Sequence, residues 1–423
     1  MDRRFEDRKN KLVLDARIDK EVDQGVMERL ALFSVPYLAG LWRREQKEHL
    51  ETYLHGLISQ LERKNVEAIA YLHDQERKGL QAFIGQSKWE HDPMLRELSQ
   101  QIGKELGEED GVLVFDPSGF EKNGRDSVGV QRQWCGRLGK LENCQVGVFM
   151  AYVSRKGQAL SDVRLYLPGE WTRDRTRRKK CGVPRRVEFR TRHDLALEML
   201  KERRPYLPHR WVAGDDEMGR SSGFRGDLRE LGERYLLSVP SNTLILELEA
   251  DALAVQEGVG VPNGRLSQVR KWVETLDPSE WTMVNVRDGE KGPLDIQILK
   301  QRVQARTEGA KIGPEELLVV TRTKEGDGVR TDYHLSNAPI QTPLEELAWA
   351  SKARHGIEDC FKQAKTEVGL KDYEVRTWAG WYHHQTLSLL AAWFLTLEAK
   401  RGKKIHTSDH SSVGARVNCE CVA

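Results

Sequence analysis

Long apolar runs and cysteines are scarce in this 423-residue sequence, and their scarcity excludes several classes of protein. The six cysteines are scattered along the chain, which predicts reduced thiols in a cytosol rather than a disulfide framework. The best candidate for a membrane span, LSLLAAWFLTL at residues 387–397, is about half as long as the roughly 20 residues that a spanning helix needs, so we expect a buried core helix. The charged start, MDRRFEDRKN, lacks the apolar core of a signal peptide, so we expect a cytoplasmic protein without membrane contact.

An excess of charge of either sign is also missing. The chain has 67 Lys and Arg against 65 Asp and Glu, so net charge says little about partners. It contains neither a Walker loop nor a dinucleotide fingerprint, which predicts no nucleotide cofactor. The pairs NCEC and YHH carry metal-ligand atoms but not the usual spacing of a zinc site.

Positive charge is concentrated in one stretch, TRDRTRRKKCGVPRRVEFRTR at residues 172–192, which holds ten Lys or Arg and two acids. Such a run can be a solvated face, but its density also predicts a strip that binds DNA phosphates. The candidate phosphate contacts within it are Arg177, Arg178, Lys179 and Lys180.

The order of helix-like and strand-like segments predicts an α/β fold with added parts. Residues 25–105 have the spacing of amphipathic helices, whereas VLVFD, QVGVFMAYV and RWVAGD are typical of strands around a helical segment. Strands separated by Gly- and Asp-rich turns follow. A helix is then predicted to begin at Pro343, with Thr342 as its N-cap. We expect the following division: a helical N-terminal domain (1–105), an α/β domain in two segments (106–243 and 341–400), a β-rich insertion (244–340) and an irregular tail (401–423).

Two carboxylates occupy the same local position in this plan. Asp116 and Asp215 each follow an apolar strand and precede a polar segment that contains glycine. Each could be an ordinary residue that starts a turn. Because ligand sites in open α/β sheets lie beyond strand ends, the two carboxylates could instead meet on adjacent strands.

A third carboxylate lies on the helix predicted to begin at Pro343. Arg354, Glu358 and Lys365 occur there at i, i+4 and i+11, which places them on one stripe of a continuous helix. A solvated charged face would explain the stripe too. Two Asp and one Glu would, however, supply the hard oxygen ligands that suit Mg²⁺ or Mn²⁺. Two such ions, about 3.5–4 Å apart, support phosphodiester cleavage, with Arg354 and Lys365 contacting phosphates.

Three longer segments of the sequence resemble a known protein family, and the resemblance extends from about residue 83 to residue 397. The segments DPSGFEKNGRDSVGVQRQWCGRLGKLENCQVGV, WVAGDDEMG and RHGIEDCFKQAKTEVGLKDYEVRTWAGWYHHQTLSLL resemble the DDE-type transposases of bacterial insertion sequences. The resemblance implies an RNase H-like mixed sheet flanked by helices, interrupted by a β-strand insertion and preceded by a helical domain that binds or pairs DNA ends. It also implies that Asp116, Asp215 and Glu358 are the catalytic residues and metal ligands.

The signature of this family around its Glu is Tyr-x2-Arg-x3-Glu-x6-Lys. Arg354, Glu358 and Lys365 match it, whereas Ser351 stands at the Tyr position. Other departures are Trp134 and Met218 in place of Tyr, and His383 in place of Arg. These departures leave open a catalytically inactive DNA-binding protein derived from a transposase. A second enzyme hypothesis is an RNase H-like nuclease without strand transfer, against which the β-rich insertion and the long N-terminal region argue.

The resemblance implies a transposase that cuts double-stranded DNA at element ends and joins the 3′ hydroxyl to target DNA, using two Mg²⁺ or Mn²⁺ ions. A homodimer that associates with the bacterial nucleoid is expected. Lys122, Arg125 and Gln131 are candidate DNA contacts beside the first acid. Trp272 and Trp281 are expected either in the core or stacked on a flipped base.

Overall fold

The computed structural model describes residues 20–248, 266–289, 292–326 and 328–408. Its N-terminal part is helical, as predicted for residues 25–105. Helix α3 buries Leu50, Leu54 and Leu57 on one face, which explains the apolar spacing seen in the sequence. The helices of this part are α2 (Lys20–Leu38), α3 (Arg44–Ile58), α4 (Val66–Leu72), α5 (Arg77–Gly85) and α6 (Asp92–Leu106).

A large mixed sheet forms the centre of the molecule. Its first strands are β1 (Val112–Glu121), β2 (Gln131–Cys135), β3 (Lys140–Ser154), β4 (Gly157–Tyr166), β5 (Trp211–Gly214) and β6 (Tyr235–Ser238). Strand β1 pairs antiparallel with β3 and parallel with β5, and β5 pairs parallel with β6. The predicted mixed sheet flanked by helices is therefore confirmed.

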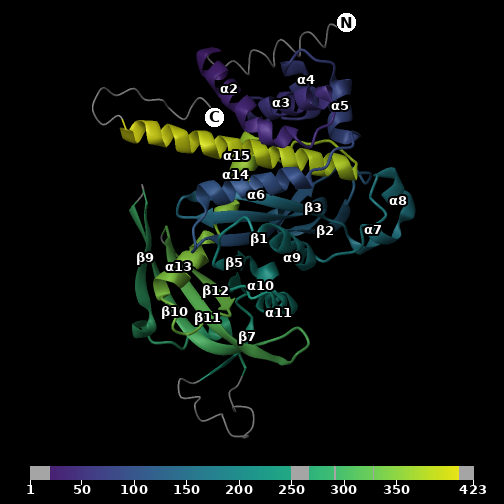
Figure 1. Ribbon diagram of the computed structural model, residues 1–423. Helices are drawn as coiled ribbons and strands as arrows, with labels where there is room; N and C mark the ends of the chain where they lie inside the picture. Colours follow the sequence, from purple (N-terminus) through teal and green to yellow (C-terminus); the bar gives the residue numbers. More distant parts are fainter. Residues whose placement is uncertain (1–19, 249–265, 290–291, 327, 409–423) are drawn as a thin grey trace.

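The strands from the predicted β-rich insertion continue this same sheet (Figure 1). They are β7 (Leu244–Glu247), β8 (Ser267–Gln268), β9 (Thr282–Gly289), β10 (Gly292–Arg306), β11 (Ile312–Glu325) and β12 (Gly328–Ser336). Strand β12 pairs antiparallel with β6, and the order then runs β12, β11, β10, β7, β8. The added strands are thus joined by backbone hydrogen bonds to those that carry the candidate acids. The domain boundaries themselves stay a prediction.

Helices cover the sheet, and the longest of them lies between helices α2–α5 and the layer formed by α6 and the sheet (Figure 1). They are α7 (Gly169–Arg173), α8 (Arg175–Lys180), α9 (Arg192–Arg203), α10 (Asp216–Arg220), α11 (Ser222–Glu230), α12 (Val269–Val273), α13 (Leu344–Ala353), α14 (Gly356–Glu367) and α15 (Trp378–Ser408). Residues 387–397 lie in α15, where Leu387, Trp393 and Phe394 are buried, so the predicted core helix is confirmed. Within the described ranges, no helix combines the length and apolarity needed to cross a membrane.

The helical part after the added strands differs from the prediction in three ways. Pro343, not Thr342, is the N-cap of α13, and Thr342 belongs to the preceding turn, where its amide donates to Pro339. One continuous helix was expected, but the chain breaks between α13 and α14. Helix α15 extends to Ser408, into the segment predicted to be an irregular tail, and residues 409–423 lie outside the described part.

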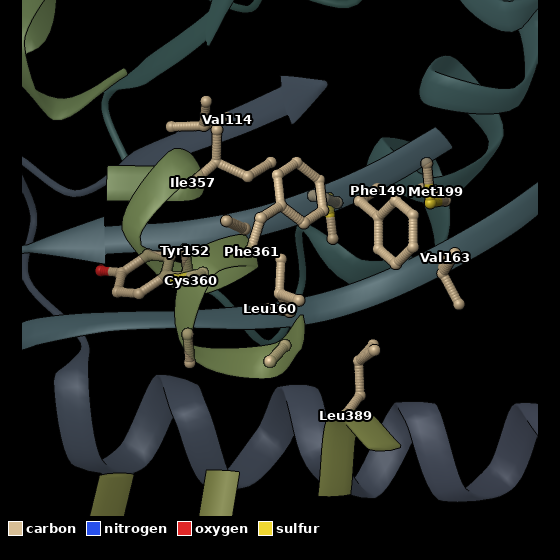
Figure 2. Packing of buried hydrophobic residues seen from close by; sticks show 14 of the residues in the cluster. Val114, Phe149, Tyr152, Leu160, Val163, Met199, Ile357, Cys360, Phe361 and Leu389 are labelled. Carbon is tan, nitrogen blue, oxygen red and sulfur yellow. The ribbon is translucent and has the colours of Figure 1, made fainter. Parts of the chain in front are cut away.

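The break between α13 and α14 has a packing cause. The chain at Gly356 comes so close to β3 that an added Cβ would lie 2.8 Å from the Val153 side chain. The turn lets α14 lie against β3, where Ile357 and Phe361 pack towards Val114 and Phe149 (Figure 2). The opposite side of α14 is thereby held towards solvent beside β1.

A buried ionic network fastens α6 and α9 to β4. The Arg203 guanidinium donates to Asp162 at 2.7 Å and also to Asp92, while Arg164 donates to Asp162 at 2.9 Å. Arg203 and Asp162 are almost wholly buried. Neither charge could remain there without its partner.

We therefore predict that Asp162→Ala lowers the free energy of unfolding by about 3–5 kcal/mol, because it leaves two guanidinium groups without their shared acceptor. Urea unfolding measures the change. The matched control is Glu48→Ala, which removes an exposed ion pair with Arg44 and should cost no more than about 1 kcal/mol. A loss below 1 kcal/mol for Asp162→Ala would contradict this account of the network.

Candidate active site

The first two acids are brought level by the parallel pairing of β1 with β5. Phe115 is in register with Gly214, so the next residues, Asp116 and Asp215, lie side by side. Strand β5 ends there, but β1 continues to Glu121 along β3. The prediction that Asp116 lies at a strand end is therefore wrong, because Asp116 lies within β1. The alternative, that it starts a turn, is wrong for the same reason. Asp116 faces the space that opens where its parallel neighbour stops.

Asp215 is fixed by the helix that follows it. It is the N-cap of α10, and its Oδ1 accepts from the amides of Glu217 and Met218 at 3.1 Å. Burial raises its pKa to about 6, although the Met218 hydrogen bond acts in the opposite direction. The neighbouring Asp216 is exposed and lies 3.5 Å from Arg220. Of these two adjacent acids, Asp215 has the more restricted geometry.

Asp116 is the most strongly perturbed of the three acids. Burial raises its pKa well above the usual range, and the nearby carboxylates of Asp215 and Glu358 raise it further. Arg354 and Lys365 lower it, but they do not compensate. Within the described residues, the Asp116 carboxylate accepts no hydrogen bond. Asp116 is half-buried, and a carboxylate in such surroundings favours a cation as its partner.

The third acid, Glu358, lies in the first turn of α14. Its Oε1 is 3.6 Å from Arg354 Nη1 and 3.6 Å from His355 Nδ1. The nearby His355 imidazole is the main reason that the pKa of Glu358 is lowered. Arg354 lies outside α14, at the C-cap of α13, so the predicted single stripe was wrong in its helical geometry.

The structure nevertheless brings the three acids and the two predicted phosphate-binding residues to one cleft of about 1300 Å³. Asp116, Asp215, Glu358, Arg354 and Lys365 all line it. Lys365 extends from α14 to β1, where its Nζ donates to Ser118 Oγ at 3.0 Å. Acids separated by more than 240 residues in the chain thus line the same cleft as two basic side chains.

Several lining residues were not predicted as site residues. They include Trp134, Arg192, Arg220, Glu308 and Lys362. The Trp134 indole is 51% exposed, and Arg192 forms a 2.7 Å ion pair with Glu217. Arg192 is the last residue of the basic run, so the sequence could have indicated it as a site residue. Nothing in the sequence indicated Glu308, which lies in the turn between β10 and β11.

The carboxylates suit a divalent cation by donor type, because all three offer hard oxygens. Their present arrangement is open: among the described side chains, no three His, Cys, Asp or Glu are placed so that they could hold an ion together. Glu358 is directed to Arg354 and His355, and one oxygen of Asp215 is occupied by α10. Ion binding would require Glu358 to rotate away from these two neighbours.

Two residues of the predicted phosphate-binding strip, Arg177 and Arg178, form contacts within the protein that stabilise the fold. Arg177 donates to the Arg125 carbonyl at 2.9 Å and lies over the Trp171 ring. Arg178 donates to the carbonyls of Pro184 and Val187.

The rest of the strip is more accessible. Lys180 pairs with Asp126 at 2.8 Å, and Lys179 is exposed. A role of these residues in DNA contact stays a prediction, with Lys179 and Lys180 the more available.

Other predicted contacts also have structural partners. Lys122 lies 3.6 Å from the centre of the Tyr373 ring, away from the cleft lining, and burial lowers its pKa to about 8. The buried Trp272 donates to Glu247 at 2.8 Å, and Trp281 stacks under Arg322. These contacts favour packing for both tryptophans. The roles of Lys122 and of Gln131, whose Oε1 is buried, stay predictions.

The residues that depart from the family signature are mostly internal. Ser351 is buried and donates to the Ala348 carbonyl, so no side chain from this position reaches a phosphate. His383 is buried and stacks on Trp89 with ring centres 3.6 Å apart. Met218 is fully buried, which leaves Trp134 as the one departure that borders the cleft within the described structure.

Comparison with known proteins agrees with the geometry. A family profile described as DDE superfamily endonuclease matches residues 36–297, which is well over half of the chain and includes Asp116 and Asp215 but ends before Glu358. A probable transposase for insertion sequence element IS701 from Microchaete diplosiphon is 28% identical over 196 residues, covering 45% of this chain and 48% of the relative. The chain thus spans about half the length of that curated relative. The extent of the family match establishes that the chain belongs to the DDE superfamily of endonucleases.

Proposed function

We propose that this protein is a transposase that cuts double-stranded DNA at the ends of an insertion sequence and joins the freed 3′ hydroxyl to target DNA. One observation carries the proposal: Asp116, Asp215 and Glu358 line a single cleft together with Arg354 and Lys365. The name of the similar transposase supports the same reaction. The active unit is proposed to be a homodimer, in the cytoplasm and bound to the nucleoid.

Asp116 and Asp215, with Glu358 completing the set, would hold two Mg²⁺ or Mn²⁺ ions. Such ions, when bound, lower the pKa of water and polarise the phosphoryl oxygens. Arg354 would neutralise the phosphate that enters beside the acids. Lys365 is held by Ser118 on β1, so its ammonium is already directed into the cleft. The helix α10 keeps the Asp215 carboxylate in one orientation through the amides of Glu217 and Met218.

Cation affinity should depend on pH, because each proton on these carboxylates competes with the ion. With the pKa of Asp215 raised to about 6, its carboxyl is largely protonated at pH 5 and ionised above pH 7. We predict that Mn²⁺ affinity, measured by calorimetry without DNA, falls at least about tenfold per pH unit as pH decreases below 6. Equal affinity at pH 5 and pH 7 would contradict the assignment of Asp215 as a ligand.

The reaction is tested by incubating the purified full chain with DNA that carries the element ends, in Mg²⁺ and in EDTA. We expect Mg²⁺-dependent cleavage, followed by joining of the labelled 3′ end to a target plasmid. Cleavage without joining would instead support a nuclease of RNase H type.

A second candidate is a catalytically inactive DNA-binding protein derived from a transposase. The buried Ser351 favours it, because the phenol of the family signature is missing there. Tight binding to element ends with no cleavage in Mg²⁺ or Mn²⁺ would support this candidate and contradict the proposed transposase.

A further inference from the structure

The guanidinium of Arg354 has one side at the cleft and one side inside the protein. Its Nη1 lies 3.6 Å from the Glu358 carboxylate, on the cleft side. Its Nε is buried and has no hydrogen-bond partner among the described residues. This nitrogen can only donate a hydrogen bond, and a buried donor without an acceptor is costly. The inner side of Arg354 therefore requires an acceptor nearby.

Strand β12 offers such an acceptor in His334, whose side chain is only 2% exposed. Its Nδ1 lies 3.2 Å from Ser238 Oγ, whereas its Nε2 is buried and lacks a partner in the described structure. Burial lowers the pKa of His334 to about 3; Asp332 acts in the opposite direction, and Arg354 lowers it further. The imidazole is therefore neutral near pH 7, with one N–H and one acceptor nitrogen.

The strand register places His334 on the side of the sheet that α13 covers. His334 and Asp332 are two residues apart on β12, so their side chains share one face of the sheet. Lys352, near the end of α13, lies 3.8 Å from Asp332. Arg354 follows two residues later as the C-cap of α13, which lies against the added strands (Figure 1).

We propose that His334 is a positioning residue for Arg354: its Nε2 accepts a hydrogen bond from Arg354 Nε, directly or through one ordered water, while its Nδ1–H donates to Ser238 Oγ. The guanidinium is then held from behind, and its Nη atoms stay turned towards the cleft. Because Arg354 Nε can only donate, the pairing fixes which nitrogen of His334 carries the proton. The inference rests on the proposed role of Arg354 in binding phosphate, and it gives the added strands a part in the reaction.

The position of the proton is measured without DNA or metal, so this test does not depend on whether the protein cuts DNA. Proton–nitrogen NMR spectra of the full chain, labelled with 15N-histidine, should show His334 with a protonated Nδ1 and an unprotonated Nε2. The signals of His334 are identified by their loss in His334→Gln. Arg354→Ala should shift the Nε2 signal. A protonated Nε2, or an Nε2 signal indifferent to Arg354→Ala, would overturn the inference.

Cleavage of element-end DNA tests the consequence for the reaction. His334→Phe keeps an aromatic ring but offers no acceptor, and it should lower the cleavage rate about tenfold to a hundredfold, the effect of losing a hydrogen bond to a charged group. His334→Gln offers a carbonyl oxygen in its place and should restore most of the rate. Circular dichroism should show both variants folded.

Two comparisons separate positioning from a general disturbance of the sheet. Thr321, opposite Asp332 on β11, also has a buried hydroxyl without a partner in the described ranges, so Thr321→Val is the matched control and should keep the wild-type rate. Arg354→Lys keeps a charge but lacks Nε, so adding His334→Phe to it should cause no further loss.

Equal effects of Thr321→Val and His334→Phe, or a full additional loss in the double variant, would overturn the inference. A wild-type chain that cuts no element-end DNA would instead contradict the proposed function. The NMR measurement would then still decide whether His334 holds Arg354.

Discussion

Replacing Asp116 with Asn should abolish cleavage and stabilise the metal-free protein at the same time. The half-buried Asp116 carboxylate has a strongly raised pKa, because folding removes much of it from water and places it near Asp215 and Glu358. At pH 8 the ionised form therefore costs folding energy, which the neutral amide does not. We expect cleavage to fall on the order of a thousandfold or more, while the Tm rises by about 2 °C for each kcal/mol of relieved repulsion and desolvation.

The sign of this stability effect can be checked with pH. A raised pKa means that the carboxyl destabilises the fold when ionised, so the gain in Asp116→Asn should be present at pH 8. It should disappear as pH falls well below about 4, where the carboxyl is protonated in the unfolded chain too. The control is Asp216→Asn, at an exposed acid beside Asp215. Retained cleavage in Asp116→Asn, or a lower Tm at pH 8, would contradict the account.

Glu358→Gln should lose cleavage to a similar extent without the gain in stability. The pKa of Glu358 is lowered, mainly by the nearby His355 imidazole and further by Arg354, so its charge is compensated in the fold. Removing that charge should leave the Tm equal or slightly reduced. Binding to element ends should persist, because Arg354 and Lys365 remain, and a gel-shift assay beside the cleavage assay separates the two effects.

The neighbouring acid on α14 provides the control for this variant. Asp359 is also exposed and bonds to Gln158, outside the cleft lining. Asp359→Asn should therefore keep full cleavage. Loss of cleavage in Asp359→Asn, or normal cleavage in Glu358→Gln, would remove Glu358 from the proposed set.

Much of the site could be predicted from the sequence because its residues carry local signals. Asp116 follows an apolar run that must form a buried strand, and Asp215 follows another. When two such strands pair in parallel, the acids that follow their apolar residues lie side by side. The sequence therefore suffices to predict that the two acids are neighbours. Glu358 was predicted from its spacing to Arg354 and Lys365, and the three do share a cleft.

The rest depends on contacts between distant segments, which spacing alone does not encode. The break before α14 follows from the close approach of Gly356 to β3, and a helix pattern in the sequence cannot reveal it. The pairing of β12 with β6 likewise makes the added strands part of the central sheet. Trp134 and Glu308 reach the cleft only because their hairpins fold towards it. Several predicted DNA contacts, such as Arg178, bind carbonyls of their own loop.

The central claim is that Asp116, Asp215 and Glu358 together hold the ions that cut DNA. The most direct measurement is a crystal structure with Mn²⁺ and element-end DNA, in which anomalous scattering locates the ions. The account predicts Mn²⁺ bonded to the carboxylates of Asp116 and Asp215, with Glu358 turned away from His355 to join them. Ions bound only elsewhere, or a cleft that binds DNA without any Mn²⁺ at these acids, would contradict it.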